Sequence, residues 1–193
     1  MVLNSKFYHQ STLKIARDLL GCFLATNIDG QITIGRIVDT EAYPLKDPAS
    51  HAYAGKTVRN AAMFGLPGYT YVYQIYERYF CFNVVTGQKN DGQAVLIRAV
   101  EPVAGLEIMQ QRRGQTHPAG LTNGPSKLTQ ALGIHKSHSN QSLLTGSVRI
   151  LAPDSFGQPR KFKISSRPRI GISKATQKPY RFCILGNKFV SKK

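Results

Sequence analysis

The stretch of sequence that decides the fold is residues 68–85, which read GYTYVYQIYERYFCFNVV. Aromatic and β-branched residues dominate it, and these residue types favour strands. The pattern predicts one strand over residues 69–76 and a second over residues 79–85, joined by a tight polar turn at Glu77-Arg78. Because a turn this short can join only antiparallel neighbours, the two strands are expected to form a β-hairpin.

More strands are expected on both sides of this hairpin. Asp29-Gly30 is a strong short-turn signal between two apolar runs, residues 22–27 and 31–39, and predicts a second hairpin. A further strand is expected over residues 93–100. Residues 44–68 show little periodicity and many Gly, Pro and Asn residues, so they are interpreted as a long loop of the kind that usually carries function.

Helical patterns are short and few. Ser11 is a plausible N-cap for a helix that runs to Leu20, with Gly21 as its stop. A second helix is expected over residues 103–113, and a third after Gly124-Pro125-Ser126. The sum predicts an α+β protein, a single domain over residues 1–193 with a largely antiparallel curved sheet flanked by helices.

The composition points to a polyanionic partner. The 193 residues include 26 Lys and Arg but only 10 Asp and Glu, a formal net charge of +16. Such a balance suits either nucleic acid or an anionic membrane surface. No apolar run approaches the roughly 20 residues that span a bilayer, and the first residues lack a signal-peptide core. A cytoplasmic location, nucleoid-associated in a bacterium, is therefore expected.

The positive charge is concentrated near the C-terminus. Residues 150–193 contain 11 of the 26 basic residues and a single acid, Asp154. Within them, Arg167-Pro168-Arg169-Ile170-Gly171 is expected to be an ordered loop that presents two arginines. A solvated basic face is the alternative, but so few acids neutralise this segment that Arg167 and Arg169 are predicted to contact a phosphate backbone.

Glu41 is the first candidate for chemistry. It ends a strand-like run just before the long loop, where a carboxylate is well placed to activate water as a general base. Taken alone, an isolated Glu is usually a surface residue. The three cysteines, Cys22, Cys81 and Cys183, are far apart and lie among apolar neighbours, so buried free thiols are expected.

Tyrosines form the second candidate group. Tyr69, Tyr71 and Tyr73 share one face of an extended strand, and tyrosine rings can stack on unpaired bases. Filling a core is the competing interpretation. His51, in the long loop, could read a base edge or bind phosphate, although a loop histidine is more often simply exposed. No metal-ligand spacing and no phosphate-binding loop is present.

Several blocks of the sequence occur together in an order that is specific to one family. These blocks are Thr40-Glu41-Ala42-Tyr43, His51, Arg59-Asn60, Met63-Phe64, Pro67-Gly68, Tyr71 to Tyr76, Tyr79 to Asn83, Leu96 to Pro102, and Gly124 to Leu128. In this order and spacing, the chain from about Thr12 to its C-terminus resembles the alkyladenine (3-methyladenine) DNA glycosylases of the mammalian type, which also occur in bacteria.

The resemblance implies a fold and an activity. It implies the methylpurine-DNA glycosylase fold and an enzyme that acts as a monomer on damaged double-stranded DNA, with no metal and no cofactor. The family flips an alkylated or deaminated purine out of the duplex and hydrolyses its N-glycosidic bond, leaving an abasic site. The expected lesions are 3-methyladenine, hypoxanthine, ethenoadenine and 7-methylguanine.

The resemblance also implies roles for individual residues. Glu41 matches the general base, and Arg98 matches a residue beside the catalytic water and the DNA backbone. The remaining matches concern the base and the duplex: walls that sandwich the flipped base (Tyr43 and Tyr73), a contact to the base edge (His51), a side chain that excludes guanine (Asn83), and a wedge that enters the duplex (Tyr76).

Two alternatives remain open from the sequence. A catalytically silent DNA- or RNA-binding module could use the same scaffold, although Glu41 and the complete set of tyrosines argue against it. A bifunctional glycosylase and lyase would need an amine nucleophile, and no lysine is distinguished by its sequence setting.

Overall fold

The computed structural model describes residues 1–157 and 161–191, and a single long strand organises it. This strand, β2 (Gln31–Tyr43), is 13 residues long and has neighbours along both edges. On one edge it pairs with β5 (Gln93–Ala104). On the other it pairs first with β1 (Phe23–Ile28) and then, over Asp39–Glu41, with β8 (Arg181–Ile184).

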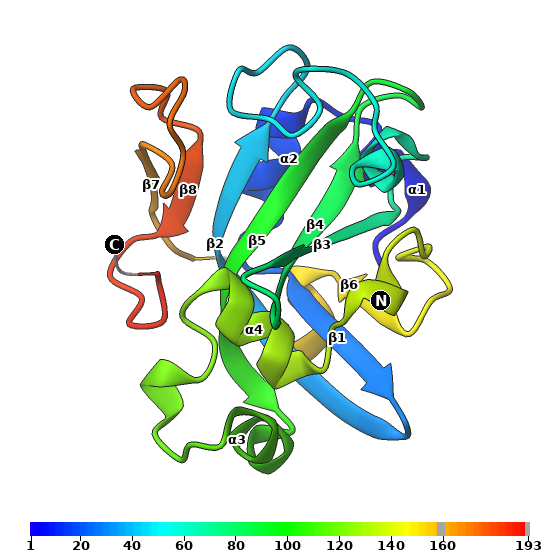
Figure 1. The fold of residues 1–193 in the computed structure, drawn as a ribbon. Coiled ribbons are helices and arrows are strands. Elements are labelled where there is room, and N and C mark those ends of the chain that lie inside the picture. Colours follow the sequence, from blue (N-terminus) through cyan, green and yellow to red (C-terminus); the bar gives the residue numbers. More distant parts are fainter. Residues whose placement is uncertain (158–160, 192–193) are drawn as a thin grey trace.

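The other strands extend this centre into a curled eight-stranded sheet (Figure 1). The strand order is β3-β4-β5-β2-β1-β6, with β8 on β2 and β7 on β8. Each pairing between these strands is antiparallel. The bounds not yet given are β3 (Thr70–Ile75), β4 (Tyr79–Thr86), β6 (Val148–Leu151) and β7 (Ile164–Arg167).

Short helices cover the sheet and complete the core. In Figure 1, α2 lies behind the upper part of β2 and β5, and α4 lies at the lower part of the sheet with α3 beneath it. The α-helices are α1 (Ser5–Tyr8), α2 (Thr12–Asp18), α3 (Leu106–Arg113) and α4 (Pro125–Leu132); four 3₁₀ helices span Ala61–Phe64, Pro118–Gly120, Lys136–His138 and Pro153–Phe156. Within the described ranges, no helix has the length and apolarity needed to cross a bilayer.

Most of the sequence-based expectations for the elements are confirmed. The fold is α+β with a curled antiparallel sheet, and both predicted hairpins form. Asp29 and Gly30 take φ values of 52° and 75°, as a two-residue hairpin turn requires. The long loop contains only one 3₁₀ turn, and all three cysteines are buried free thiols.

Several boundaries were predicted wrongly: the first helix ends at Asp18 and not at Leu20, and β2 continues to Tyr43. Residues 103–104 belong to β5 and not to the helix, because Ala104 still pairs with Ile34. The turn between β3 and β4 begins at Tyr76 and not at Glu77: β3 ends at Ile75, and both Tyr76 and Glu77 have left-handed φ values, 45° and 56°. Left-handed conformations cost a non-glycine residue roughly 1–2 kcal/mol each.

Three register shifts interrupt the pairing of β2 with β5, and the first, between Ile34 and Gly35, makes Val103 an extra residue in β5. Opposite partners are Ile37 with Val100 and then Asp39 with Ala99, so Val38 is an extra residue in β2. The next pair is Thr40 with Ile97, which makes Arg98 an extra residue in β5. Bulges of this kind redirect side chains and recur beside active sites.

A buried ion pair attaches β8 to β2. The Arg181 guanidinium donates to both carboxylate oxygens of Asp39, at 3.0 and 2.8 Å, and to the carbonyl of Ser191 at 2.8 Å. Asp39 is fully buried and Arg181 is only 5% exposed. The pair therefore holds both β8 and the C-terminal segment against the central strand.

The two glycines that flank α3 provide a test of this packing. Gly105 and Gly114 both have left-handed φ values, 75° and 61°. A Cβ at Gly105 would lie 2.4 Å from the carbonyl oxygen of Ile32, whereas a Cβ at Gly114 meets nothing within 4 Å. We expect Gly114→Ala to lower the free energy of unfolding by about 1–2 kcal/mol. Gly105→Ala should cost about 1–3 kcal/mol more, because it also overpacks β2.

Urea unfolding of the two variants beside wild type measures both values. Equal losses at the two positions would contradict the tight approach of β2 to the start of α3.

Candidate active site

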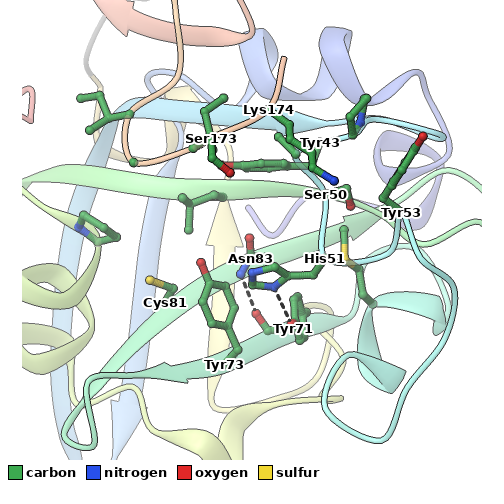
Figure 2. Close-up of a pocket in the computed structure, with 18 of the residues that line it drawn as sticks. Tyr43, Ser50, His51, Tyr53, Tyr71, Tyr73, Cys81, Asn83, Ser173 and Lys174 are labelled. Carbon is green, nitrogen blue, oxygen red and sulfur yellow. Dashed lines mark hydrogen bonds between the residues drawn. The ribbon is translucent and has the colours of Figure 1, made fainter. Parts of the chain in front are cut away.

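A pocket of about 420 Å³ opens between the long loop, the sheet and the segment that follows β7. Figure 2 shows Tyr43 with Ser173 and Lys174 on one side of the pocket, and His51, Tyr71 and Tyr73 on the other. Its lining is predominantly aromatic and small apolar side chains with a few polar groups, as ligand sites usually are. The lining residues are Tyr43, Pro48, Ala49, Ser50, His51, Tyr53, Ala54, Met63, Tyr71, Tyr73, Cys81, Asn83, Leu96, Arg98, Pro125, Ile170, Gly171, Ile172, Ser173 and Lys174.

One row of the sheet forms the floor of this pocket. Glu41 on β2 pairs with Leu96 on β5, Leu96 pairs with Asn83 on β4, and Asn83 pairs with Tyr71 on β3. Directly opposed residues of antiparallel strands project to the same face. Four strands that are distant in sequence therefore bring Glu41, Asn83 and Tyr71 to one face.

Glu41 lies just behind the lining and is fully buried. Its Oε1 accepts a hydrogen bond from the backbone N–H of Ile170 at 2.8 Å and lies 3.2 Å from an Arg98 guanidinium nitrogen. Its Oε2 accepts from the Tyr43 hydroxyl at 2.9 Å. All three of these partners line the pocket, so the carboxylate is one side chain away from any molecule that fills it.

Aromatic rings form the other walls. Tyr71 and Tyr73 are stacked, with ring centroids 5.4 Å apart, as residues two apart on a strand should be. The imidazole of His51 packs edge-on to Tyr73 at 4.5 Å, and its Nδ1 lies 3.0 Å from the Tyr71 hydroxyl. Asn83 donates its side-chain N–H to the Tyr71 carbonyl at 3.0 Å, which fixes the amide in one orientation.

The phenols and the imidazole of the pocket stay uncharged near neutral pH. Burial raises the pKa of Tyr71 to about 12. Burial also raises the pKa of Tyr43, and the negative charge of Glu41 raises it further. Burial and then the neighbouring Cys81 raise the pKa of Tyr73. The pKa of His51 is lowered, first by burial of its ring and then by the positive charge of Arg59.

Four of the residues predicted to serve the site lie outside the pocket lining: Glu41 and Arg169 are buried, whereas Tyr76 and Arg167 are exposed. Tyr76 is at the tip of the β3–β4 hairpin, with 85% of its surface exposed. Arg167 is the last residue of β7 and is also exposed. His51 in the long loop is also exposed, whereas the remaining members of the predicted set are buried or half-buried.

The prediction that Arg169 contacts a DNA backbone is wrong for its side chain. Arg169 is only 5% exposed. Its guanidinium forms a buried ion pair with Asp47 at 3.0 Å and donates to the carbonyl of Ala42 at 2.9 Å. The loop presents its arginine to the interior because a buried carboxylate is there to receive it.

Sequence reasoning missed several groups of the pocket. Tyr71 was placed on one strand face with Tyr73 as a ring that could stack on a base, but it was given no role in the pocket. Cys81 and Met63 lie in blocks that carry the family resemblance, but neither was named as a site residue. The lining residues 170–174 come from a segment that no local pattern connects to the tyrosine strand.

Within residues 1–157 and 161–191, no three His, Cys, Asp or Glu side chains converge on a point where they could hold a metal ion.

Comparison with known proteins agrees with this architecture. A model of the methylpurine-DNA glycosylase family matches residues 6–188. A protein of Methanoculleus marisnigri is 46% identical over the full length of both chains, and one of Carboxydothermus hydrogenoformans is 45% identical, also over both full lengths. A protein of Francisella tularensis is 46% identical over 94% of each chain. All three carry the name "Putative 3-methyladenine DNA glycosylase".

The chain therefore belongs to the methylpurine-DNA glycosylase family. Its partner is DNA, and its role is in DNA repair. In enzymatic terms it is a hydrolase of N-glycosyl bonds in the DNA-3-methyladenine glycosylase class.

Proposed function

We propose that this enzyme flips a damaged purine out of double-stranded DNA into the tyrosine pocket and releases it by hydrolysis with a water activated by Glu41. The product is an abasic site. A base inside a duplex cannot be reached, so extrusion must come first, at a cost of a few kcal/mol that is smallest for a damaged base.

The observation that carries this proposal is the hydrogen bonding of Glu41. A carboxylate has about four lone-pair positions. The Ile170 N–H occupies one on Oε1, which is also 3.2 Å from its ion-pair partner Arg98, and the Tyr43 hydroxyl occupies one on Oε2. One position on Oε2 is left to accept a hydrogen bond from water on the pocket side, which is what a general base needs.

Arg98 supports this role in two ways. Its guanidinium, 3.2 Å from Glu41 Oε1, is the ion-pair partner of this buried carboxylate. Its buried Nε has no hydrogen-bond partner within the described residues, so it has an N–H left to donate to a water in the pocket. Breaking the glycosidic bond builds positive charge on the sugar, and the ionised Glu41 stabilises that charge.

The pocket walls suit an alkylated purine. Tyr43 lies opposite His51 and Tyr73 across the cavity (Figure 2), which leaves a slot for a flat base between them. Electron-rich, neutral tyrosines attract cations, so the positively charged bases 3-methyladenine and 7-methylguanine are the primary substrates that we propose. Hypoxanthine and ethenoadenine are neutral and fit the same slot less favourably. His51 contacts the base edge, and the fixed amide of Asn83 crowds the exocyclic amino group of guanine.

The rest of the proposed interface lies around this slot. Tyr76, exposed at a strained turn, is the wedge that replaces the extruded base, and Arg167 contacts the phosphate backbone. Strained backbone of this kind is concentrated at functional sites. The whole chain, residues 1–193, acts as one domain and as a monomer.

Glu41→Gln tests the chemistry. The amide keeps the shape of the side chain but cannot take a proton from water, so single-turnover release of 3-methyladenine should fall by at least about 10²-fold. Affinity for the damaged duplex should persist. Release close to the wild-type rate would show that Glu41 is not the general base. In a separate test, a covalent protein–DNA adduct trapped with borohydride would point instead to a lyase that uses Lys174 at the pocket mouth.

Tyr76→Ala tests the wedge, with Tyr79→Ala from the same hairpin as its control. Tyr79 is 44% exposed and starts β4. Loss of a ring that stacks in the duplex should weaken lesion binding by about 1–3 kcal/mol and reduce the fluorescence of a 2-aminopurine beside the lesion. An equal effect of both variants would argue against a wedge at Tyr76.

Arg167→Ala tests the backbone contact. If Arg167 binds one phosphate, the slope of log affinity against log salt should become shallower by roughly 0.9. Arg149 is an exposed arginine on the far edge strand β6, and Arg149→Ala should leave the slope unchanged. An unchanged slope for Arg167→Ala would show that this side chain faces solvent in the complex.

A further inference from the structure

Arg169 makes an unusual number of contacts for a buried side chain. Its guanidinium donates to the Ala42 carbonyl at 2.9 Å and to Asp47 Oδ1 at 3.0 Å. It also lies over two aromatic rings, 4.6 Å from the centroid of Tyr43 and 5.4 Å from that of Tyr180. One planar cation thus has a polar partner along its edge and aromatic partners on its faces, an arrangement to which arginine is suited and lysine is not.

These contacts connect three parts of the proposed active site. Ala42 lies between Glu41 and Tyr43 on β2. Asp47 begins the turn that leads to His51, and its Oδ1 also accepts from the N–H of Ala49 at 2.9 Å. The residue after Arg169, Ile170, donates its N–H to Glu41 Oε1.

Stability alone does not account well for this pair. Arg169 Nε and Asp47 Oδ2 are buried and have no hydrogen-bond partner within the described residues. Buried ion pairs often contribute no more stability than apolar side chains of the same volume, and incompletely bonded pairs contribute least. Unlike an apolar side chain, Arg169 forms directional hydrogen bonds that fix the positions of its partners.

We propose that Arg169 is a positioning residue for base release. Its guanidinium holds the base wall Tyr43, the Asp47–His51 turn and the Ile170 N–H in fixed geometry around Glu41. This inference rests on the proposed function, in which Glu41 activates water and Tyr43 and His51 hold the base. Arg169 touches neither the base nor the water, so it acts only through these groups.

The expected consequence is a loss of rate without a loss of DNA binding. A displacement of about 1 Å in a reacting group can lower a rate about 100-fold. Affinity for DNA comes mostly from phosphate contacts, and the buried Arg169 makes none.

The test uses the double variant Arg169→Met/Asp47→Asn, which removes the cation without leaving a buried carboxylate unpaired. Two quantities are measured on the full-length protein: the single-turnover rate of 3-methyladenine release at saturating enzyme, and the dissociation constant for a duplex that carries an uncleavable abasic-site analogue. The rate should fall about 30- to 100-fold, and the dissociation constant should stay within about threefold, since the phosphate contacts are intact. Arg169→Lys should be intermediate, because an ammonium can bond Asp47 or Ala42 but cannot cover the Tyr43 ring.

The chain offers a matched control in Arg181→Met/Asp39→Asn. This pair is as deeply buried and has the same ion-pair chemistry, but the Arg181 side chain contacts the C-terminal segment and not the pocket. It should lower the urea midpoint of unfolding. The release rate of the folded enzyme should fall much less than in the Arg169 double variant, because this pair reaches the pocket only through the strand β8.

Three outcomes would overturn the proposal. The first is a wild-type release rate in the Arg169 double variant, and the second is an equal loss of rate in the Arg181 control, which would indicate general loosening. If the double variant does not fold, Arg169→Lys serves in its place, and a wild-type rate for it is the third. Glu41→Gln is measured in parallel. If Glu41→Gln still releases the base, the proposed function is wrong. If Glu41→Gln is inactive but the Arg169 variants release the base at the wild-type rate, only the positioning role of Arg169 is wrong.

Discussion

The buried ion pair between Asp39 and Arg181 is the constraint on which the rest of the site depends. It is the buried ion pair among several links between the last part of the chain and the central strand, and it lies where β8 pairs with β2 over Asp39–Glu41. Removing one partner of such a pair typically costs 3–5 kcal/mol, because the other charge is left buried and alone. The ion pair stabilises more than the pairing of β8 with β2. The segment between β7 and β8 contributes one whole side of the pocket, including the Ile170 N–H that binds Glu41. Without β8 in place, Glu41 would lose a partner and the pocket would lose a wall.

Much of this architecture could be predicted because the signals for it are local. Alternating aromatic and β-branched residues predicted the β3–β4 hairpin, and Asp29-Gly30 predicted the turn between β1 and β2. Gly21 and Gly114 follow helices for the same conformational reason. The position of Glu41 near the end of a strand was also a local inference. Each of these features depends on a few neighbouring residues, so a sequence alone contains them.

The remaining features depend on pairs of residues that are far apart in the chain. Arg169 looked like a surface arginine because its neighbours are basic and polar, and nothing local shows that Asp47, 122 residues away, is its partner. Arg98 is an extra residue at a bulge, and a bulge is a property of two strands in register. The turn at Tyr76 was placed one residue late because a tyrosine rarely takes a left-handed φ, and only the tertiary structure imposes it. The positions of these side chains depend on tertiary contacts, which the composition of the neighbouring sequence does not reveal.

The basic residues of the chain fall into two groups, buried and exposed, and only the exposed group can attract DNA from solution. Three of the arginines, Arg98, Arg169 and Arg181, are buried and paired with Glu41, Asp47 and Asp39. Each pair is nearly neutral at a distance, so these arginines add little to the potential outside the protein. The same pairing takes three of the 10 acidic residues out of the surface as well. Outward-facing acids are therefore scarcer than the composition suggests, and the exposed surface keeps its positive excess. Inside, Arg98 is paired with Glu41 and the buried phenols are uncharged, so the exposed Lys174 is the cation that remains among the lining residues. In the function proposed above, the positive exterior would attract the phosphates, while the aromatic walls and the paired Arg98 would surround the base with little positive charge.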